Sequence, residues 1–435
     1  MKYVIDVTQL VHWEGRLTGI PRVVQELAVR FPSNEREVVF VSWVKEVQDM
    51  CEVDLDATLA IRGNGIEYVK EGASVESTER VLDAPVESTK LSFTRRSKTF
   101  AKKVLRRIGV EDSRFVTKFR QDLHQKEILT YKRLTIESDD VFFIGAGEWW
   151  DNNFINLVLG YNQKGVKIVQ VSHDLLPIVT PQFSGHATES LSIYNSKIMP
   201  ISALVLANSE STKRDLIAWL KAKNLTVPKV EVFRIGEDFT IEPPVKPSDA
   251  VFKALNLKGG DFIISVGTIE ARKNHALLYY TYKLAVSRGV KLPKLLVIGR
   301  RGWKTEEIYE YITNDPATKN SLVPLHDISD AELSWLYDNA LFTIYPSFYE
   351  GWGMPIAESI MRGTPALASN TSSMPEVAPG YAHYFNPSST DELLDAIIAM
   401  LKPGAVEKDK AKIKDYTPTS WDDSFTQVFN YLEKI

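Results

Sequence analysis

Short apolar runs that alternate with turns and helical patterns constrain the fold of this chain more than any other feature. In the first half, buried-strand candidates lie at residues 3–7, 38–44, 141–144, 166–171 and 203–207. The alternation restarts after a polar run with three prolines at residues 239–248, and the later candidates are residues 262–266, 295–298, 322–325, 341–345 and 365–369. This pattern predicts two α/β domains with parallel sheets, which bind ligands at the carboxyl ends of their strands and in the cleft between the domains.

The composition is that of an ordinary globular protein. The 435 residues are 44% hydrophobic and 25% charged, and 52 basic against 56 acidic residues give a net charge of −4, so no nucleic-acid partner is expected. The single cysteine, Cys51, can form no internal disulfide and rules out a multi-cysteine metal site. The N-terminus meets an acidic residue too early for a signal peptide, and no apolar run approaches the ~20 residues of a membrane span. We therefore expect a cytoplasmic protein.

One segment of the second half predicts a binding site. The apolar run at residues 340–345 leads into a turn with Gly351 and Gly353, and Pro355 suits the first position of a helix. A strand that ends in a glycine turn and a helix N-terminus presents free backbone N–H groups and a positive dipole to an anion. We expect the backbone at Gly351, Gly353 and Met354 to contact the phosphates of a ligand.

Charged side chains surround this predicted anion site. Glu350 in the turn and Glu358 in the helix are suited to accept hydrogen bonds from hydroxyl groups, one of a sugar ring and one of a ribose, which indicates a nucleotide-sugar site. Arg272 and Lys273 follow another strand and can reach the same cleft, where they would neutralise a leaving diphosphate. The alternatives are a surface Arg-Lys pair, a turn residue that caps the helix, and a solvated helix glutamate.

Three motifs in order carry a resemblance to a known family. They are Gly267-Thr-Ile-Glu-Ala-Arg-Lys-Asn274, the Glu350-x7-Glu358 spacing after a Pro-Ser turn, and Gly363-Thr-Pro-Ala-Leu-Ala-Ser. This region, roughly residues 260–390, resembles the retaining glycosyltransferases of family 4. The resemblance implies the GT-B fold, with two Rossmann-like parallel-sheet domains facing across a cleft. It implies an acceptor-binding domain at residues 1–240, a nucleotide-sugar-binding domain at 241–415, and a helix at 416–435 that crosses back to the first domain.

The resemblance also implies roles for individual residues. Lys273 would contact the donor phosphates, Glu350 would support charge development at the donor sugar, and Glu358 would bind the ribose hydroxyls. Thr268 stands where such enzymes often carry an arginine, and Arg272 is the candidate substitute.

In the first half, two further sites are predicted. His173 and Asp174 follow the strand at 166–171, where they are suited to contact a sugar hydroxyl or the acceptor, and the resemblance assigns His173 to the donor sugar. The turn that ends at Gly19 resembles a loop that approaches the donor diphosphate through backbone N–H groups. A structural histidine and a simple helix-capping glycine are the alternatives.

Two other patterns have weaker implications. Asp54-Leu-Asp56 satisfies the Asp-x-Asp pattern of metal-dependent transferases, but enzymes with the GT-B fold bind diphosphate without a metal, so we expect neither a metal nor a cofactor. The polar residues from about 52 to 95 are expected to form a loop. Residues 94–108 are basic and carry apolar residues at helical spacing, so they could contact anionic lipid at the inner face of the membrane or pack on the domain as a solvated helix.

The resemblance implies a retaining, metal-independent hexosyltransferase that moves a hexose from a nucleotide sugar to a hydroxyl of a growing glycan or lipid-linked glycan. The wording of the motifs is most similar to mannosyltransferase-type members that build bacterial surface polysaccharides such as lipopolysaccharide, so GDP-mannose is the first donor expected. The alternatives are a UDP- or dTDP-sugar donor, a non-catalytic nucleotide-sugar-binding subunit, and a glycosidase that uses the two carboxylates.

Overall fold

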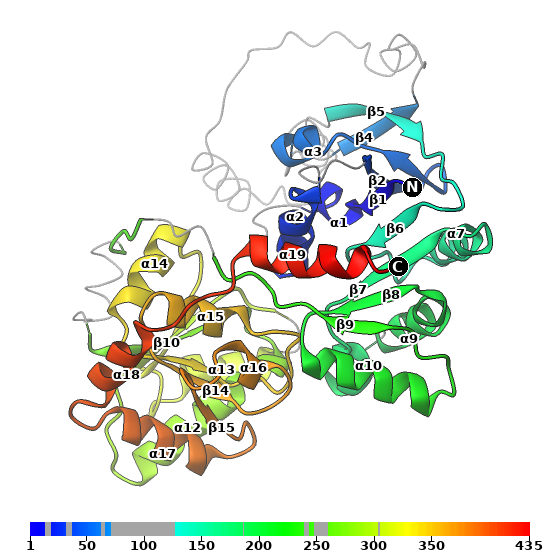
Figure 1. The fold of residues 1–435 in the computed structure, drawn as a ribbon. Coiled ribbons are helices and arrows are strands. Elements are labelled where there is room, and N and C mark those ends of the chain that lie inside the picture. Colours follow the sequence, from blue (N-terminus) through cyan, green and yellow to red (C-terminus); the bar gives the residue numbers. More distant parts are fainter. Residues whose placement is uncertain are drawn as a thin grey trace, which may run out of the picture.

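The computed structural model describes residues 1–13, 19–31, 37–61, 66–70, 127–185, 187–238, 243–247, 260–302 and 305–435. The chain forms two α/β domains, each built around its own sheet (Figure 1). This confirms the predicted fold class. The basic segment at residues 94–108 lies outside the described residues.

The sheet of the N-terminal domain has nine strands among the described residues, in the order β4-β5-β3-β2-β1-β6-β7-β8-β9. The strands are β1 (Tyr3–Asp6), β2 (Val38–Val44), β3 (Asp49–Glu52), β4 (Ile66–Lys70), β5 (Glu127–Arg133), β6 (Val141–Ile144), β7 (Lys167–Ser172), β8 (Leu204–Ala207) and β9 (Val230–Val232). The neighbouring strands β2-β1-β6-β7-β8-β9 of this order all pair in parallel. Strand β3, by contrast, runs antiparallel to both β2 and β5. The predicted parallel sheet is therefore extended by a mixed edge that the sequence pattern did not reveal.

Helices and short 3-10 turns connect these strands. They are α1 (Thr8–Val11), α2 (Ile20–Ala28), α3 (Leu55–Ile61), α7 (Asn152–Gln163), α8 (Leu176–Val179), η2 (Pro181–Phe183), α9 (Ala187–Ile198), η3 (Met199–Ile201) and α10 (Glu210–Ala222). Helix α3 and strand β4 lie within the stretch expected to be a loop, so that expectation was wrong there.

In the C-terminal domain, the described residues form a six-stranded parallel sheet in the order β12-β11-β10-β13-β14-β15. Its strands are β10 (Phe262–Val266), β11 (Lys294–Ile298), β12 (Leu322–Leu325), β13 (Thr343–Tyr345), β14 (Ala366–Ser369) and β15 (His383–Phe385). Its helical elements are η4 (Ala271–Lys273), α12 (His275–Ser287), α13 (Glu306–Asn314), α14 (Asp330–Asn339), α15 (Met354–Met361), α16 (Met374–Val377), α17 (Thr390–Met400) and α18 (Ala405–Ile413). The side chains of β10, β11, β13 and β14 are almost entirely buried, as expected of parallel strands with helices on both faces.

The last helix, α19 (Trp421–Leu432), lies beside α2 of the N-terminal domain (Figure 1). Phe425 packs edge-on against Phe31 with 5.1 Å between ring centroids, and Arg30 contacts Asp422 at 2.7 Å. Trp421 packs so closely against Gly236 that a Cβ atom there would lie 2.4 Å from the indole. The chain therefore crosses from the C-terminal domain back to the first one.

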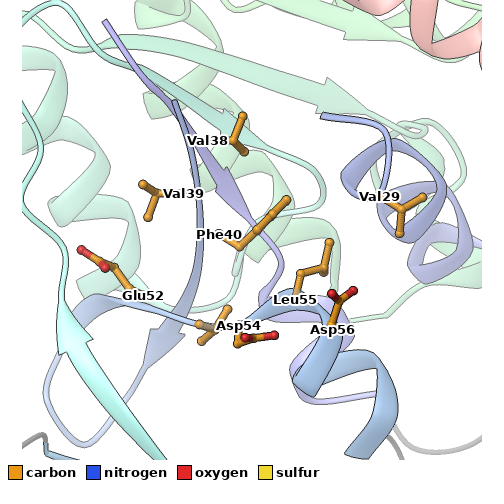
Figure 2. Close-up of a pocket in the computed structure, with 9 residues that line it drawn as sticks. Val29, Val38, Val39, Phe40, Glu52, Asp54, Leu55 and Asp56 are labelled. Carbon is orange, nitrogen blue, oxygen red and sulfur yellow. The ribbon is translucent and has the colours of Figure 1, made fainter. Parts of the chain in front are cut away.

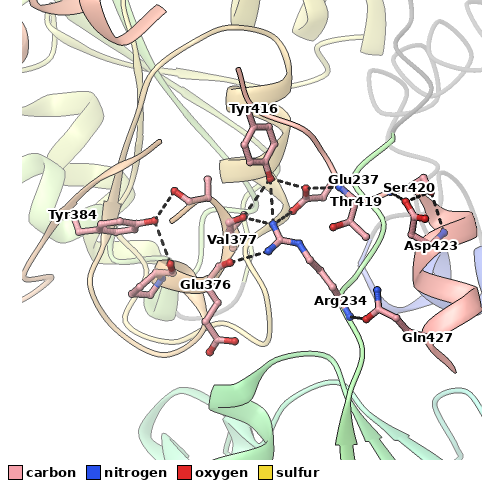
Figure 3. Close-up of polar contacts among 12 residues, drawn as sticks. Arg234, Glu237, Glu376, Val377, Tyr384, Tyr416, Thr419, Ser420, Asp423 and Gln427 are labelled. Carbon is pink, nitrogen blue, oxygen red and sulfur yellow. Dashed lines mark hydrogen bonds and ion pairs between the residues drawn. The ribbon is translucent and has the colours of Figure 1, made fainter. Parts of the chain in front are cut away.

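A polar network joins the domains where the chain crosses between them (Figure 3). Arg234 donates to the carbonyl of Val377 at 2.5 Å and forms a 3.0 Å ion pair with Glu237. Glu237 is fully buried and also accepts a 2.6 Å hydrogen bond from the hydroxyl of Tyr416. The Arg234 guanidinium lies over the ring of Trp352, 5.2 Å from its centroid. One arginine thus connects both crossing segments to the loop before α15.

A second contact between the domains is a helix cap. The Glu376 carboxylate, from α16, accepts hydrogen bonds from the backbone N–H groups of Glu210 and Ser211 at 2.7 and 2.8 Å. These groups belong to the first turn of α10 and have no partner within the helix. The C-terminal domain therefore satisfies a helix terminus of the N-terminal domain.

Candidate active site

The loop between β13 and α15 has the strand–turn–helix geometry that the sequence predicted. Gly353 is the N-cap residue of α15 with φ 132°, a conformation that favours glycine, and Met354 begins the helix. Ser373 holds the turn because its hydroxyl donates to the carbonyls of Glu350 at 2.8 Å and Trp352 at 2.6 Å. Hydrogen bonds within the protein therefore hold the backbone of this loop without a ligand.

Glu350 lies directly against the two predicted cations. Its Oε1 is 2.6 Å from the Arg272 guanidinium and 2.8 Å from Lys273 Nζ. Burial acts to raise the pKa of Glu350, but Lys273 and Arg272 outweigh it and lower that pKa to about 2. Glu270 adds a second carboxylate 3.4 Å from Arg272. The cluster is a compact group of two cations and two anions at the carboxyl ends of β10 and β13.

Lys273 is held by more than its ion pair. Its Nζ donates to the hydroxyl of Tyr345 and lies 4.7 Å from the centroid of that ring. Burial lowers the pKa of Lys273, and the Glu350 charge offsets this only in part. A buried ammonium with one carboxylate partner favours the approach of further negative charge.

Asn274 fixes the position of this cluster, a role that the sequence analysis did not assign. It follows η4 with left-handed backbone angles, φ 58° and ψ 39°. Its side-chain amide donates to the carbonyls of Pro346 at 3.1 Å and Pro387 at 2.8 Å. Asparagine tolerates this conformation better than most residues, which is the sequence signal that could have indicated its role.

The loops of the two domains meet at Gly351. A Cβ atom on Gly351 would lie 2.1 Å from the carbonyl oxygen of His173 and 3.1 Å from Cβ of Asp174. The structure therefore brings the His173–Asp174 turn of the N-terminal domain into contact with the loop that carries Glu350. Only glycine allows this approach.

His173 is held as a neutral imidazole. Its Nε2 lies 2.6 Å from the carbonyl oxygen of Gly145, and because that oxygen only accepts, Nε2 carries the hydrogen. Burial lowers the pKa of His173 to about 4. Asp174 organises the turn, since its Oδ1 accepts from the backbone N–H of Leu176 at 2.9 Å. Burial raises the pKa of Asp174, and the nearby Glu350 adds to that effect.

Glu358 and Gly19 lie at the edges of the site. Glu358 is half-buried in α15 and accepts a 3.1 Å hydrogen bond from the hydroxyl of Tyr337 in α14. Gly19 is the N-cap residue of α2 with φ 61°, and a Cβ atom there would meet no heavy atom within 4 Å. Its positive φ, rather than a close neighbour, is the physical reason for glycine at the start of α2.

The Asp-x-Asp pattern lies elsewhere. Asp54 and Asp56 line a pocket of about 410 Å³ together with Val38 and Phe40 (Figure 2). Val38 begins β2, so this pocket opens at the amino ends of the parallel strands, whereas Glu350 and His173 follow carboxyl ends. Among the described residues, no three His, Cys, Asp or Glu side chains are grouped as metal ligands would be.

Glycine-lined backbone contacts behind Lys273 were also missed by the sequence analysis. A Cβ atom on Gly299, after β11, would lie 1.9 Å from the carbonyl oxygen of Gly267, after β10. The two strand ends can approach only because Gly299 has no side chain, and this places the chain from Gly267 to Lys273 beside β11. Gly267 is favoured for another reason, its positive φ of 145°. In the part of the chain that the structure describes, no helix is long and apolar enough to cross a bilayer.

Comparison with known proteins finds a family match in the second half of the chain. Residues 248–419 match the family model described as glycosyl transferases group 1. The chain is 26% identical to serotype-specific mannosyltransferase WbdA of Escherichia coli, over 52% of the chain and 29% of that protein. It is 29% identical to O-antigen chain mannosyltransferase B of Escherichia coli, over 43% of the chain and 50% of that protein. The chain thus covers half or less of the length of these relatives.

Solved structures share the whole fold. Sucrose-phosphate synthase from Thermosynechococcus elongatus aligns over 100% of this chain and 98% of its own, with a TM-score of 0.58 and 15% identity. Anabaena Alr3699/HepE in complex with UDP and glucose aligns over 100% of both chains, with a TM-score of 0.58 and 14% identity. These similarities show the fold, which is GT-B as predicted.

Proposed function

We propose, from the premise that residues 248–419 form a domain of the glycosyl transferases group 1 family, that the protein is a retaining hexosyltransferase. It transfers a hexose from a nucleoside diphosphate sugar to a hydroxyl group of a growing glycan. One observation carries the proposal: Glu350 contacts Arg272 and Lys273 at a helix N-terminus, and the neutral His173 turn of the other domain closes against the same loop.

In this proposal the cations and the N-terminus of α15 bind the donor diphosphate. A phosphate group that approaches Arg272 and Lys273 competes with Glu350 for their donors, and free backbone N–H groups at Gly353 and Met354 add hydrogen bonds. The charge that develops on the leaving phosphate is stabilised by groups that are already in place. Glu358 accepts hydrogen bonds from the ribose hydroxyls.

Glu350 and His173 act at the donor sugar. A carboxylate whose pKa is about 2 remains anionic throughout the physiological range and stabilises positive charge at the anomeric carbon. Because Nε2 of His173 donates to Gly145, its Nδ1 is an acceptor for a sugar hydroxyl. Asp174 keeps the turn in place.

The transfer needs no protein nucleophile. The bond from the anomeric carbon to the phosphate oxygen breaks, and the acceptor oxygen forms a bond to that carbon on the same face. The acceptor proton moves to the departing phosphate oxygen. Closure of the Gly351 loop on the His173 turn excludes water, which suppresses hydrolysis of the donor.

The relatives support a choice of donor and acceptor. The curated relatives are named as mannosyltransferases, and one name refers to the O-antigen chain, so we propose GDP-mannose as donor and a bacterial surface glycan as acceptor. UDP and glucose are named with a solved structure of the same fold, so a UDP-sugar is the alternative donor. We assign acceptor binding to residues 1–240 and donor binding to residues 241–415. Lipid contact by residues 94–108, at the inner face of the membrane, stays a prediction.

Calorimetric titration of GDP, UDP and dTDP, with EDTA or with Mg²⁺, tests the proposed function. We expect one nucleotide, GDP, to bind preferentially in both solutions, and the matching sugar nucleotide to be consumed only when an oligosaccharide acceptor is present. If none of the three binds, the nucleotide-sugar transferase is excluded, and a glycosidase assay on the same oligosaccharides becomes the next measurement.

A further inference from the structure

Two adjacent tryptophans lie on the loop after β6, outside the site described so far. Trp150 has 47% of its surface exposed, and Trp149 packs edge-on against it with 4.9 Å between ring centroids and 76° between ring planes. Trp149 is partly buried against the core of the N-terminal domain. An exposed indole braced by a second one presents a fixed flat apolar face to solvent.

Close contacts hold the backbone of this loop at both ends. At one end, the carbonyl oxygen of Gly145 accepts a hydrogen bond from Nε2 of His173. At Gly147, which has φ 75°, a Cβ atom would lie 2.6 Å from the hydroxyl of Tyr194. At the other end Asp151 accepts from the backbone of Asn153 at 2.9 Å and from the Trp43 indole at 3.0 Å. Trp150 is therefore exposed on a loop whose backbone is held by contacts on both sides of the tryptophan pair.

The tryptophans follow the carboxyl end of β6, on the same side of the sheet as the His173 turn. Strand β6 pairs in parallel with β7, and the loops after the two strands are joined by the Gly145–His173 bond. His173 in turn meets Gly351 of the donor loop. The loop of the Trp149–Trp150 pair is thus the neighbour of the loop that contacts the donor loop. It belongs to the domain to which we assign acceptor binding.

The residue that precedes the pair on this loop is a buried carboxyl group. Glu148 is 3% exposed, and its Oε1 accepts a 3.4 Å hydrogen bond from the half-buried Gln9 amide. Burial, with a contribution from Asp6, raises the pKa of Glu148 to about 7. A pyranose ring has an apolar face of C–H groups, which matches the exposed face of an indole.

We propose that Trp150, braced by Trp149, is the stacking platform for a sugar ring of the acceptor glycan. This inference rests on the proposed function for the identity of the ligand as an acceptor. A lipid surface is the competing occupant, since tryptophan also lies in membrane interfaces. The sugar is favoured because the pair follows the carboxyl end of β6, beside the loop of His173 that meets the donor loop at Gly351.

Trp150→Ala and Trp150→Phe test the platform, with Tyr280→Ala as the matched control. Tyr280 is 51% exposed on α12 of the other domain, so its removal deletes an exposed aromatic of similar accessibility far from the loop. The probe is an α-linked mannotetraose, measured both as acceptor in transfer and as ligand in calorimetric titration without donor. We expect Trp150→Ala to raise the acceptor KM and Kd roughly five- to tenfold, and Trp150→Phe to restore most of the loss. The donor KM and the nucleotide Kd stay unchanged in every variant.

Other outcomes overturn the proposal. An unchanged acceptor KM and Kd in Trp150→Ala would show that no sugar stacks there. Loss of binding to phosphatidylglycerol vesicles with unchanged acceptor binding would assign the tryptophans to a membrane. A rise in nucleotide Kd in Trp150→Ala would assign the residue to the donor site or to the fold. If the wild-type protein binds no nucleotide, the proposed function fails, while the titration of mannotetraose alone still tests the platform.

Discussion

At the scale of single residues, charge compensation explains the candidate site. Glu350 and Lys273 are each 9% exposed, and either charge alone in that position would be costly. Arg272 and Lys273 keep the carboxylate ionised, and the carboxylate keeps the two cations together. The same arrangement that allows burial therefore prepares two cations for a diphosphate and one anion for a sugar.

Glu350→Gln tests the role of the carboxylate. The substitution keeps the shape but removes the charge that stabilises the anomeric carbon, so we expect kcat to fall about 10²- to 10³-fold. Binding of the nucleoside diphosphate should be equal or tighter, because Arg272 and Lys273 lose a competing anion. Glu358→Gln is the control with the opposite pattern, a higher nucleotide Kd and a smaller change in kcat. Steady-state kinetics with wild-type kcat in Glu350→Gln would contradict the assignment.

The buried His275 gives the fold a pH dependence. Burial lowers its pKa from 6.5 to about 4, with Lys273 adding to that effect. The unfolded chain therefore binds a proton below pH 6.5 that the folded chain binds only below about pH 4. The stability that depends on neutral His275 is complete above pH 6.5 and is lost as the pH falls to about 4.

His275→Gln is expected to remove this dependence. Across the window from pH 6.5 to 4, the free energy of unfolding of the wild type should fall by on the order of 1–3 kcal/mol more than that of the variant. Urea denaturation at several pH values measures the difference, which cancels contributions from the carboxylates. Parallel curves for the two proteins would show that His275 titrates normally.

At the scale of elements, glycine positions decide which loops can meet. Gly351 separates Glu350 from α15 and is the point where the donor loop touches the His173 carbonyl. Gly160 within α7 also lacks a side chain, but a Cβ atom there would meet nothing within 4 Å. The two residues provide a matched pair for the cost of closing the loops.

Gly351→Ala should separate the two loops, since the new Cβ would lie 2.1 Å from a backbone oxygen. We expect a loss of about 1–3 kcal/mol in the free energy of unfolding and a fall in kcat of at least roughly tenfold. Gly160→Ala should instead stabilise the protein by up to about 1 kcal/mol and leave kcat unchanged. Urea denaturation and initial rates measure both, and equal effects of the two substitutions would refute the packing argument.

At the scale of the whole molecule, Arg234 and Glu376 hold the two domains in register. Glu376 caps α10 from across the domain boundary. Arg234 joins both crossing segments of the chain, as Figure 3 shows. Within the N-terminal domain, Ser209 caps the same helix through a 3.0 Å hydrogen bond from the backbone of Thr212. Helix α10 therefore has one cap that depends on domain docking and one that does not.

Glu376→Ala is expected to loosen the docking of the domains. Loss of the cross-domain cap should increase the radius of gyration in small-angle scattering and lower kcat by roughly tenfold, because the donor loop no longer closes on His173. Ser209→Ala should destabilise the protein by about 1 kcal/mol without a change in the radius of gyration. If the two variants scatter alike, Glu376 acts only as a helix cap.

Much of the architecture was readable in the sequence because it depends on local pattern. The predicted runs at residues 262–266 and 365–369 became β10 and β14, and the turn from Glu350 to Met354 became a helix N-terminus. The strands β3, β4, β5, β9 and β15 were missed. They are short or partly polar, so they carry no continuous apolar run, and their pairing is decided by neighbours distant in the chain.

Hydrophobic periodicity and glycine or proline punctuation act over a few residues, so the two α/β domains and the residue types of the candidate site could be read from local sequence alone. The tertiary structure alone decided that one carboxylate oxygen of Glu350 meets both cations, that Gly351 meets His173, and that Glu376 caps a helix of the other domain. These contacts join residues far apart in the chain. Their distances depend on how whole domains pack, which no local pattern encodes.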